Sequence, residues 1–261
     1  MKELKVLHII TRLILGGAQE NTLFTVEGLM ERGHCVTLAT GPAVGPEGSL
    51  IERARKNGVD LIIIPALRRE INPFRDTLAF FNLYRLIKQG GYDIVHTHSS
   101  KAGILGRLAA RLAGCRVILH TIHGLPFHPY QNRFLNWIYL TSEKMVEGFT
   151  ARLIVVAEPL AQQAVKAGLA RPDRFVTIYS GIEMEKFTES GGKGREIRAK
   201  FGIPEDAPVI GKVARLFHLK GHDYLLSAAP EIVRAFPEVR FLLVGDGILR
   251  RNLEEKVKEM R

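Results

Sequence analysis

The sequence predicts an α/β protein whose first part is a doubly wound, mostly parallel sheet. Short β-branched, apolar runs alternate with longer segments of helical periodicity along the 261 residues, which is the pattern of repeated strand–helix–strand units. Runs such as residues 61–64 are apolar at every position, as expected of strands that are buried on both faces. Glycines such as Gly58 and Gly114 follow helical segments and indicate where they end.

The elements of the first part follow one another in alternation. The expected strands span residues 4–10, 36–39, 61–64, 94–97, 117–120, 153–156 and 175–178. The expected helices span residues 18–32, 50–57, 77–88 and 101–113. A polar, glycine-rich stretch at residues 190–194 interrupts the alternation and indicates a linker. We therefore expect an N-terminal Rossmann-like domain over residues 1–185 and a second domain over residues 186–261.

The alternation restarts in the second domain and stops after two strands. We expect helices over residues 196–201 and 224–235, strands over residues 209–214 and 240–244, and a last helix up to residue 261. Two strands cannot cover both faces of a parallel sheet. We therefore expect this domain to be only the first part of a Rossmann-like domain, with the rest beyond Arg261.

Composition and charge narrow the class of protein. The chain is 46% hydrophobic and 25% charged, which is ordinary for a soluble globular protein, and its start lacks the pattern of a secretory signal. Cys35 and Cys115 form no metal or redox spacing, so we expect a reduced, cytoplasmic setting. Of the net charge of +10, +8 falls in residues 1–180. This excess either serves solubility alone or favours an anionic membrane surface as a partner. Nucleic acid is not expected, because no basic run with interleaved aromatic residues indicates a nucleic-acid groove.

Two segments of the first domain combine aromatic with basic residues. Residues 65–89 contain Phe74, Phe80, Phe81 and Tyr84 among arginines and lysines, and residues 126–137 contain Phe127, Tyr130, Phe134 and Trp137 near Arg133. Such surface helices suit peripheral attachment to the inner face of the cell membrane. Packing of these aromatic side chains in the core is an equally good interpretation.

A pair of glycines, Gly16 and Gly17, follows the first expected strand and precedes a helix. Glycine lets backbone N–H groups approach a ligand, and the N-terminus of a helix favours an anion. Ligands of open α/β sheets bind beyond the carboxyl ends of the strands. The spacing is not the dinucleotide fingerprint, and a simple strand–helix connection is the alternative.

Histidines gather at the ends of the fourth and fifth expected strands: His96, His98, His120 and His123. Strand alternation puts His96 and His98 on the same side. No cysteine or carboxylate stands at the spacing that a zinc site would need, so we expect no metal. Structural histidines satisfied in the core are the alternative, but two groups at adjacent strand ends favour at least one functional imidazole.

In the second domain, Arg215 and Lys220 follow a buried strand and precede a helix. A planar guanidinium together with a lysine point charge suits the binding of a diphosphate. A solvated loop is the alternative.

Together these residues resemble the GT-B fold glycosyltransferases of family 4. The glycine turn, residues 121–124 (Thr-Ile-His-Gly), residues 179–183 with Phe187, residues 213–221 and residues 243–247 are similar in order to that family's motifs. Residues 96–103 are similar to members that build bacterial surface polysaccharides on lipid carriers. Ser180 and Glu183 replace the commoner Asn and Asp of the family signature.

The resemblance implies a retaining transfer of a sugar from a nucleotide-diphosphate sugar to a glycan acceptor that is linked to a lipid. It implies that Gly16, Gly17, Arg215 and Lys220 bind the donor diphosphate across an interdomain cleft. It also implies that His123 is catalytic, orienting the donor sugar or stabilising an oxocarbenium-like centre, and that His98 and Lys101 lie on the acceptor side. No metal or other cofactor is implied, since the chain has no Asp-x-Asp motif.

One family feature is missing. The family has two glutamates separated by seven residues that hold the donor, and no such pair occurs in this chain. We therefore expect the 261-residue chain to be inactive by itself. A non-catalytic partner subunit of the same fold and a GT-B nucleotide-sugar epimerase stay open as alternatives.

Overall fold

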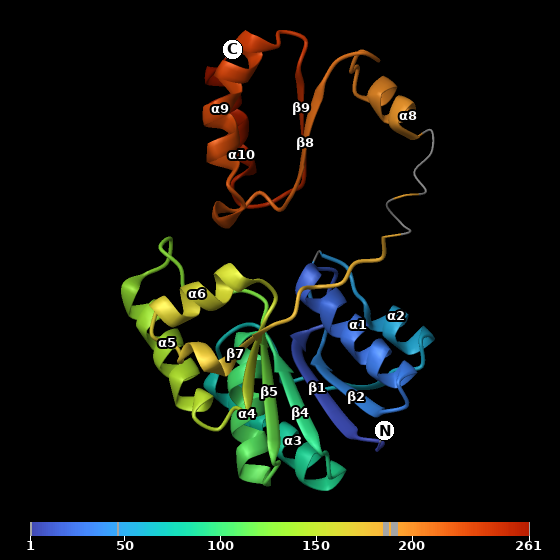
Figure 1. Ribbon diagram of the computed structural model, residues 1–261, viewed down its shortest axis with the longest axis vertical. Helices are drawn as coiled ribbons and strands as arrows, with labels where there is room; N and C mark the ends of the chain where they lie inside the picture. Colours follow the sequence, from blue (N-terminus) through green and yellow to red (C-terminus); the bar gives the residue numbers. More distant parts are fainter. Residues whose placement is uncertain (1, 46, 185–187, 189–192, 261) are drawn as a thin grey trace. The chain divides into compact units, whose positions relative to one another are not determined.

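The computed structural model describes residues 2–45, 47–184, 188 and 193–260. It divides into two compact units, Met1–Ile182 and Glu183–Arg261, which Figure 1 shows in blue to yellow and in orange to red. The predicted boundary at residue 185, the linker residues 190–192 and Phe187 of the family signature lie outside the described residues. Each unit is described by itself below.

The first unit contains a seven-stranded sheet in the order β3-β2-β1-β4-β5-β6-β7. Every neighbouring pair of strands is parallel. The strands are β1 (Lys5–Arg12), β2 (Cys35–Gly41), β3 (Asp60–Ile63), β4 (Ile94–His98), β5 (Val117–Ile122), β6 (Arg152–Val155) and β7 (Phe175–Thr177). The predicted doubly wound, parallel sheet is therefore confirmed.

Helices lie on both faces of this sheet (Figure 1). One face carries α1 (Gly17–Glu31) and α2 (Ile51–Lys56), and the other carries α3 (Pro73–Gly90), α4 (Ser100–Ala113), α5 (Arg133–Glu147) and α6 (Glu158–Lys166). A short 3-10 helix, η1 (Pro172–Arg174), precedes β7. Helices α5 and α6 lie where no helix was predicted. Local signals for both exist, because Asn132 accepts a hydrogen bond from the Phe134 N–H and Pro159 starts α6.

The interior strand β1 is buried on both sides. Leu7 and Ile9 pack with the helices α3 and α4, whereas Val6 and Ile10 pack with α1 and α2. Full burial of one Leu or Ile side chain stabilises a fold by about 1.5–3 kcal/mol. The alternation explains why the apolar run of β1 has no polar face, and it fixes which side chains of the neighbouring strands share each face.

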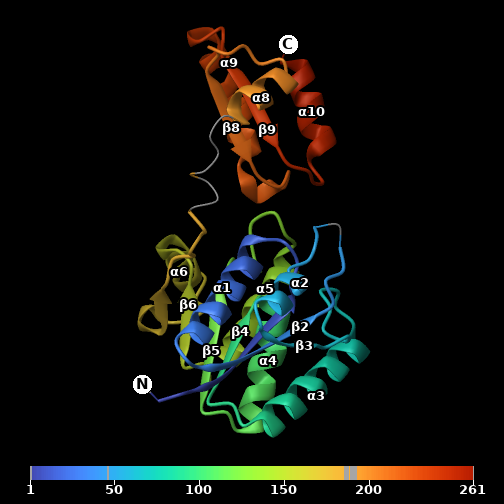
Figure 2. The ribbon, with the colours of Figure 1, turned by 90° about the vertical axis from the view of Figure 1, so that its right-hand side faces the viewer.

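The second unit contains two parallel strands, β8 (Val209–Val213) and β9 (Arg240–Val244). Figure 2 shows them together with α8 (Lys193–Lys200), α9 (His222–Ala235) and α10 (Arg250–Glu259); the 3-10 helix η2 (His218–Lys220) precedes α9. The core of this unit is small and centres on Leu216, Leu226 and Leu253. In the described ranges, no helix of either unit has both the length and the apolar character needed to cross a membrane.

Candidate active site

The predicted site residues of the first unit come from the carboxyl ends of three adjacent strands. The glycine turn follows β1, His98 ends β4, and His123 follows β5 directly. Since these strands are parallel neighbours in the sheet, their carboxyl ends lie along one edge. The fold therefore gathers along this edge residues that are far apart in the sequence.

The glycine turn leaves the start of α1 open. Gly16 caps α1 with extended backbone, and no side chain caps the helix. A Cβ atom on Gly17 would meet nothing within 4 Å, and one on Gly16 would meet only the end of the flexible Gln19 side chain. The protein's own packing therefore does not require glycine at position 17, and the open backbone is suited to close approach by an anionic ligand.

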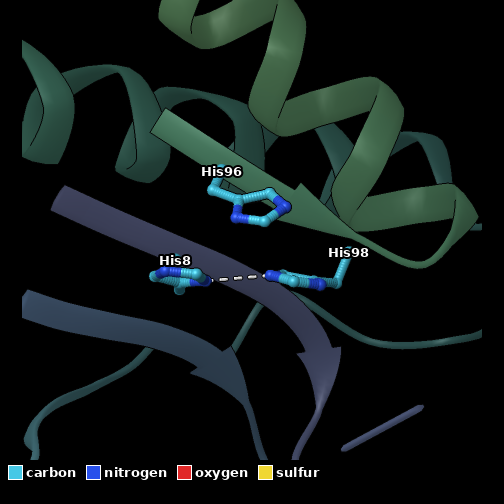
Figure 3. A group of neighbouring side chains, drawn as sticks. All are labelled: His8, His96 and His98. Carbon is cyan, nitrogen blue, oxygen red and sulfur yellow. Dashed lines mark hydrogen bonds between the residues drawn. The ribbon is translucent and has the colours of Figure 1, made fainter. Parts of the chain in front are cut away.

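A line of imidazole rings connects β1 to the residue after β5. His8 Nδ1 lies 2.9 Å from His98 Nε2, and His98 Nδ1 lies 3.1 Å from His123 Nε2. Figure 3 shows His8 on β1 facing His98 on β4. His8 is not among the site residues predicted from the sequence. The sequence signal for His8 was its position in the middle of an apolar strand, because a buried polar side chain is normally hydrogen-bonded to a partner.

The other two predicted histidines lie on opposite faces of the sheet. His96 shares a face with His98, as predicted, and its Nε2 lies 2.8 Å from Thr121 Oγ1. His120 is on the face that α4 covers, and its Nδ1 lies 2.9 Å from Thr97 Oγ1. A Cβ atom on Gly103 would lie 2.6 Å from the His120 ring, so α4 packs closely on this side chain. His120 therefore lies apart from the line formed by His8, His98 and His123.

Burial keeps these rings neutral. It lowers the pKa of His8 to about 3 and that of His123 to about 4. It also lowers the pKa of His98 well below its usual value, with neighbouring imidazoles acting in the same direction. At neutral pH each ring therefore carries one N–H and one lone pair.

His8, His96 and His98 are also the histidines that could hold a metal ion, since one ring nitrogen of each lies within 4.8 Å of the others. The 2.9 Å between His8 and His98 is a hydrogen-bond length, whereas two imidazole nitrogens on a tetrahedral zinc lie about 3.3 Å apart. His96 Nε2 is directed at Thr121. The contacts are thus those of a hydrogen-bond network.

A cavity of about 150 Å³ adjoins His123. Its lining residues are Ser99, Ser100, residues 120–126, Glu143 and Leu169. Glu143 on α5 is buried and pairs with Arg107 of α4. This carboxylate was not predicted from the sequence, because nothing in the local pattern of α5 marks Glu143 as an inward-facing residue. The cavity brings a buried carboxylate and an imidazole to the same small volume.

Two further predicted residues have contacts that point to supporting roles. His98 is buried between His8 and His123. The Lys101 ammonium forms an ion pair with Asp76 Oδ1 at 2.6 Å and donates to the Glu70 carbonyl, which ties α4 to the start of α3. Their assignment to the acceptor side stays a prediction. The contacts themselves favour a structural role for Lys101 and a place behind His123 for His98.

In the second unit, Arg215 and Lys220 lie in the segment that follows β8. Both are exposed, and in the described part of the chain neither forms an ion pair; the Arg215 guanidinium stacks over Phe217 at 5.6 Å. The Gly245–Gly247 turn packs against this segment so closely that a Cβ atom on Gly245 would lie 2.0 Å from the Ala214 carbonyl oxygen. The Leu216 N–H also donates to the Asp246 carbonyl. The segment is thus fixed by its backbone while its two cations stay exposed.

Comparisons with known proteins identify the family of the chain. Residues 15–186 match the family described as glycosyltransferase family 4, and residues 194–261 match the one described as glycosyl transferases group 1. A UDP-Gal:alpha-D-GlcNAc-diphosphoundecaprenol alpha-1,3-galactosyltransferase of Escherichia coli is 32% identical over 97% of this chain and 64% of its own length. A D-inositol 3-phosphate glycosyltransferase of Catenulispora acidiphila is 28% identical over 84% of this chain and 53% of its own length.

Solved structures show the same architecture. The crystal structure of HepE from Anabaena in complex with UDP and glucose gives a TM-score of 0.75 at 16% identity and covers 99% of this chain and 67% of that chain. At this identity the likeness shows the fold alone. The chain spans less than two thirds of the length of the Escherichia coli and Catenulispora relatives.

Proposed function

Because the chain belongs to glycosyltransferase family 4, we propose that it transfers a sugar, with retention of configuration, from a nucleotide-diphosphate sugar to a lipid-linked glycan. The observation that carries this proposal is the pair of exposed cations, Arg215 and Lys220, fixed beyond β8 with no ion-pair partner in the described residues. Two unpaired cations on a rigid backbone are suited to a diphosphate.

In this proposal the cations bind the donor diphosphate and stabilise the negative charge that develops on it as the glycosidic bond breaks. In the first unit, the open N–H groups at Gly16 and Gly17 are likewise assigned to donor phosphate oxygens. No metal ion is assigned a part. HepE was solved with UDP and glucose, which supports a nucleotide-sugar donor for this chain as well.

His123 is assigned to the reacting sugar. Its ring is half-buried, lines the cavity beside Glu143 and is neutral at pH 7, since burial lowers its pKa to about 4. A neutral imidazole can donate or accept one hydrogen bond at a sugar hydroxyl or at the departing oxygen. Retention is proposed to proceed by attack on the same face of the sugar, without a pair of catalytic carboxylates.

The acceptor is proposed to be carried on a lipid at an anionic membrane surface. The name of the Escherichia coli relative specifies a diphosphoundecaprenol-linked acceptor. In this chain, Phe134 and Trp137 of α5 are more than half exposed beside Arg133, and aromatic and basic side chains together suit the lipid interface. Phe80 and Tyr84 pack against the core instead.

The donor site is tested by isothermal titration calorimetry of UDP, GDP and ADP with the chain and with Arg215→Ala and Lys220→Ala. A hydrogen bond to a charged group contributes about 1.5–3 kcal/mol, so we expect each substitution to weaken binding of the preferred nucleotide by about tenfold or more. Arg251→Ala is the matched control, because Arg251 is an exposed arginine of the same unit that pairs with Glu255.

Unchanged nucleotide binding by both variants would show that Arg215 and Lys220 are not part of the donor site. Product analysis then tests the reaction itself, in a protein that also carries the family's glutamate pair, because the 261-residue chain is expected to be inactive by itself. Release of a nucleoside diphosphate that requires an acceptor, with the donor's anomeric configuration kept in the product, supports the proposal. Conversion of the donor sugar without an acceptor would instead identify an epimerase.

A further inference from the structure

We propose that the buried line of His8 and His98 holds His123 in the tautomer with its proton on Nδ1, with His98 as the positioning residue. His123 would then present an N–H donor, rather than a lone pair, to its ligand. The inference about the tautomer stands on the geometry of the first unit; only the identity of the ligand as a sugar rests on the proposed function.

The three rings form a continuous line of hydrogen bonds. His98 lies between the other two, with Nε2 at 2.9 Å from His8 Nδ1 and Nδ1 at 3.1 Å from His123 Nε2. His8 and His98 are almost completely buried, whereas His123 is partly exposed. The line therefore begins inside the sheet and ends at the cavity.

Each ring is neutral at pH 7, because burial lowers the pKa of all three side chains. A neutral imidazole has one N–H and one acceptor nitrogen. In a line of such rings, the direction of one hydrogen bond fixes the direction of the other. Only two arrangements are therefore possible, and they differ in which nitrogen of His123 carries the proton.

The unpartnered end of the line decides between the two arrangements. His8 Nε2 is buried and has no hydrogen-bond partner in the described residues. If the bonds ran from His123 to His8, this nitrogen would carry a buried N–H without an acceptor. If they run from His8 to His123, it carries only an unused lone pair. A buried N–H without a partner is rarer in proteins than an unsatisfied acceptor, so the second arrangement is favoured.

The favoured direction sets the chemistry of His123. His8 Nδ1–H donates to His98 Nε2, and His98 Nδ1–H donates to His123 Nε2. The proton of His123 must then be on Nδ1, which has no partner in the part of the chain that the structure describes. A fixed N–H donor suits an electron-rich oxygen, such as a sugar hydroxyl or the oxygen of a departing phosphate.

His96 provides an internal control. It is buried on the same face of the sheet, and its ring centroid is 4.3 Å from that of His98. Its Nε2, however, is directed at Thr121 and not at the line of rings. Replacing His96 removes a buried imidazole without breaking the line. A metal held by His8, His96 and His98 would in contrast need His96 as much as the other two.

The experiment is a long-range ¹H–¹⁵N correlation spectrum of the 261-residue chain labelled with ¹⁵N-histidine, at pH 7 and without ligand. We expect His123 to show a protonated Nδ1 and an unprotonated Nε2. In His98→Leu the Nε2–H form should rise to at least about a tenth of the population, because His123 Nε2 no longer accepts a hydrogen bond. In His8→Leu the single tautomer should persist, because the buried Nε2 of His98 then becomes the unpartnered end of the line and selects the same direction. His8→Gln keeps an N–H donor for His98 and should also keep the single tautomer, and His96→Gln should leave His123 unchanged.

A wild-type His123 protonated at Nε2 would overturn the proposal, and this spectrum decides even if a variant does not fold. An equal response of His123 to His96→Gln and His98→Leu would also overturn it. So would tight Zn²⁺ binding, followed by calorimetry, that is lost in His96→Gln, since the cluster would then be a metal centre. None of these results depends on nucleotide binding, so failure here is separate from failure of the proposed donor site.

Discussion

At the scale of single residues, the buried pair Arg107–Glu143 is expected to be sensitive to substitution. Both side chains are buried, and the pair joins α4 to α5 at the cavity beside His123. Burial lowers the pKa of Arg107, and the Glu143 carboxylate opposes that shift. Arg107 also donates to the Gly103 carbonyl, but its Nη1 has no partner in the described residues. The Arg107 guanidinium therefore depends on Glu143 to offset most of the cost of burying its positive charge.

Replacing Glu143 with Leu should destabilise the protein by about 3–5 kcal/mol, because a buried guanidinium is left without its counter-charge. Chemical denaturation followed by circular dichroism measures this loss. The double variant Arg107→Met with Glu143→Leu removes both charges and should recover most of the stability. A double variant as unstable as the single one would show that Glu143 acts through packing and not through its charge.

Ser99 has an unusual backbone conformation. It is the non-glycine residue with positive φ in the described chain, at 62°, and it precedes α4 directly. Its Oγ lies 2.8 Å from Thr11 Oγ1, which links the ends of β1 and β4. Strain of this kind persists where surrounding contacts hold it, and it often accompanies functional sites. Here it lies at the lining of the cavity.

At the scale of elements, α5 combines two roles on its two sides. Glu143 and Val146 face the interior, while Phe134, Trp137 and Met145 are more than half exposed. The Phe134 and Trp137 rings stack at 5.9 Å. An amphipathic helix of this kind can place its aromatic side at a membrane interface while the other side supports the active site.

We expect Phe134→Ser with Trp137→Ser to reduce binding to vesicles of anionic phospholipid severalfold, because the aromatic contact with the interface is lost. Co-sedimentation with vesicles measures the bound fraction. Tyr224→Ser is the matched control, since Tyr224 is an exposed aromatic residue of the second unit. Equal binding to neutral and anionic vesicles would contradict the electrostatic part of the idea, and unchanged binding by the double variant would contradict the part assigned to α5.

At the scale of the whole molecule, the buried histidines couple the stability of the first unit to pH. Burial lowers the pKa of five of them: His8, His96, His98, His120 and His123. In the unfolded chain a histidine has a pKa of about 6.5. Between that value and the lower pKa of the folded state, only the unfolded chain takes up protons. Lowering the pH below about 6.5 therefore destabilises the folded unit.

The free energy of unfolding should be level from pH 8 to pH 7 and should fall as the pH decreases from 6.5 to 5. Each buried histidine contributes up to about 1.4 kcal/mol per pH unit. Urea denaturation at a series of pH values measures the slope. His8→Leu should have a slope that is shallower by up to one such contribution. A slope that is identical in the variant and the wild type would show that His8 is not kept neutral by burial.

Much of the fold follows from local patterns. The predicted strand at residues 240–244 matches β9 residue for residue, and those of β1 to β8 are correct within a few residues, because periodicity and glycine positions act over a few residues. Helices α5 and α6 were missed. The helical period of α5 is at least as regular as that of α1 or α4, so a signal for α5 was present in the sequence.

The sequence alone also located the glycine turn, His98 and His123 at strand ends, and the cations Arg215 and Lys220 in a loop. It could not show that His8 contacts His98, 90 residues away, or that Arg107 contacts Glu143, 36 residues away. Periodicity reports which face a side chain takes, whereas the order and register of the strands decide which side chains meet. Only the tertiary structure therefore determined that His123 stands at the end of a line of buried imidazoles.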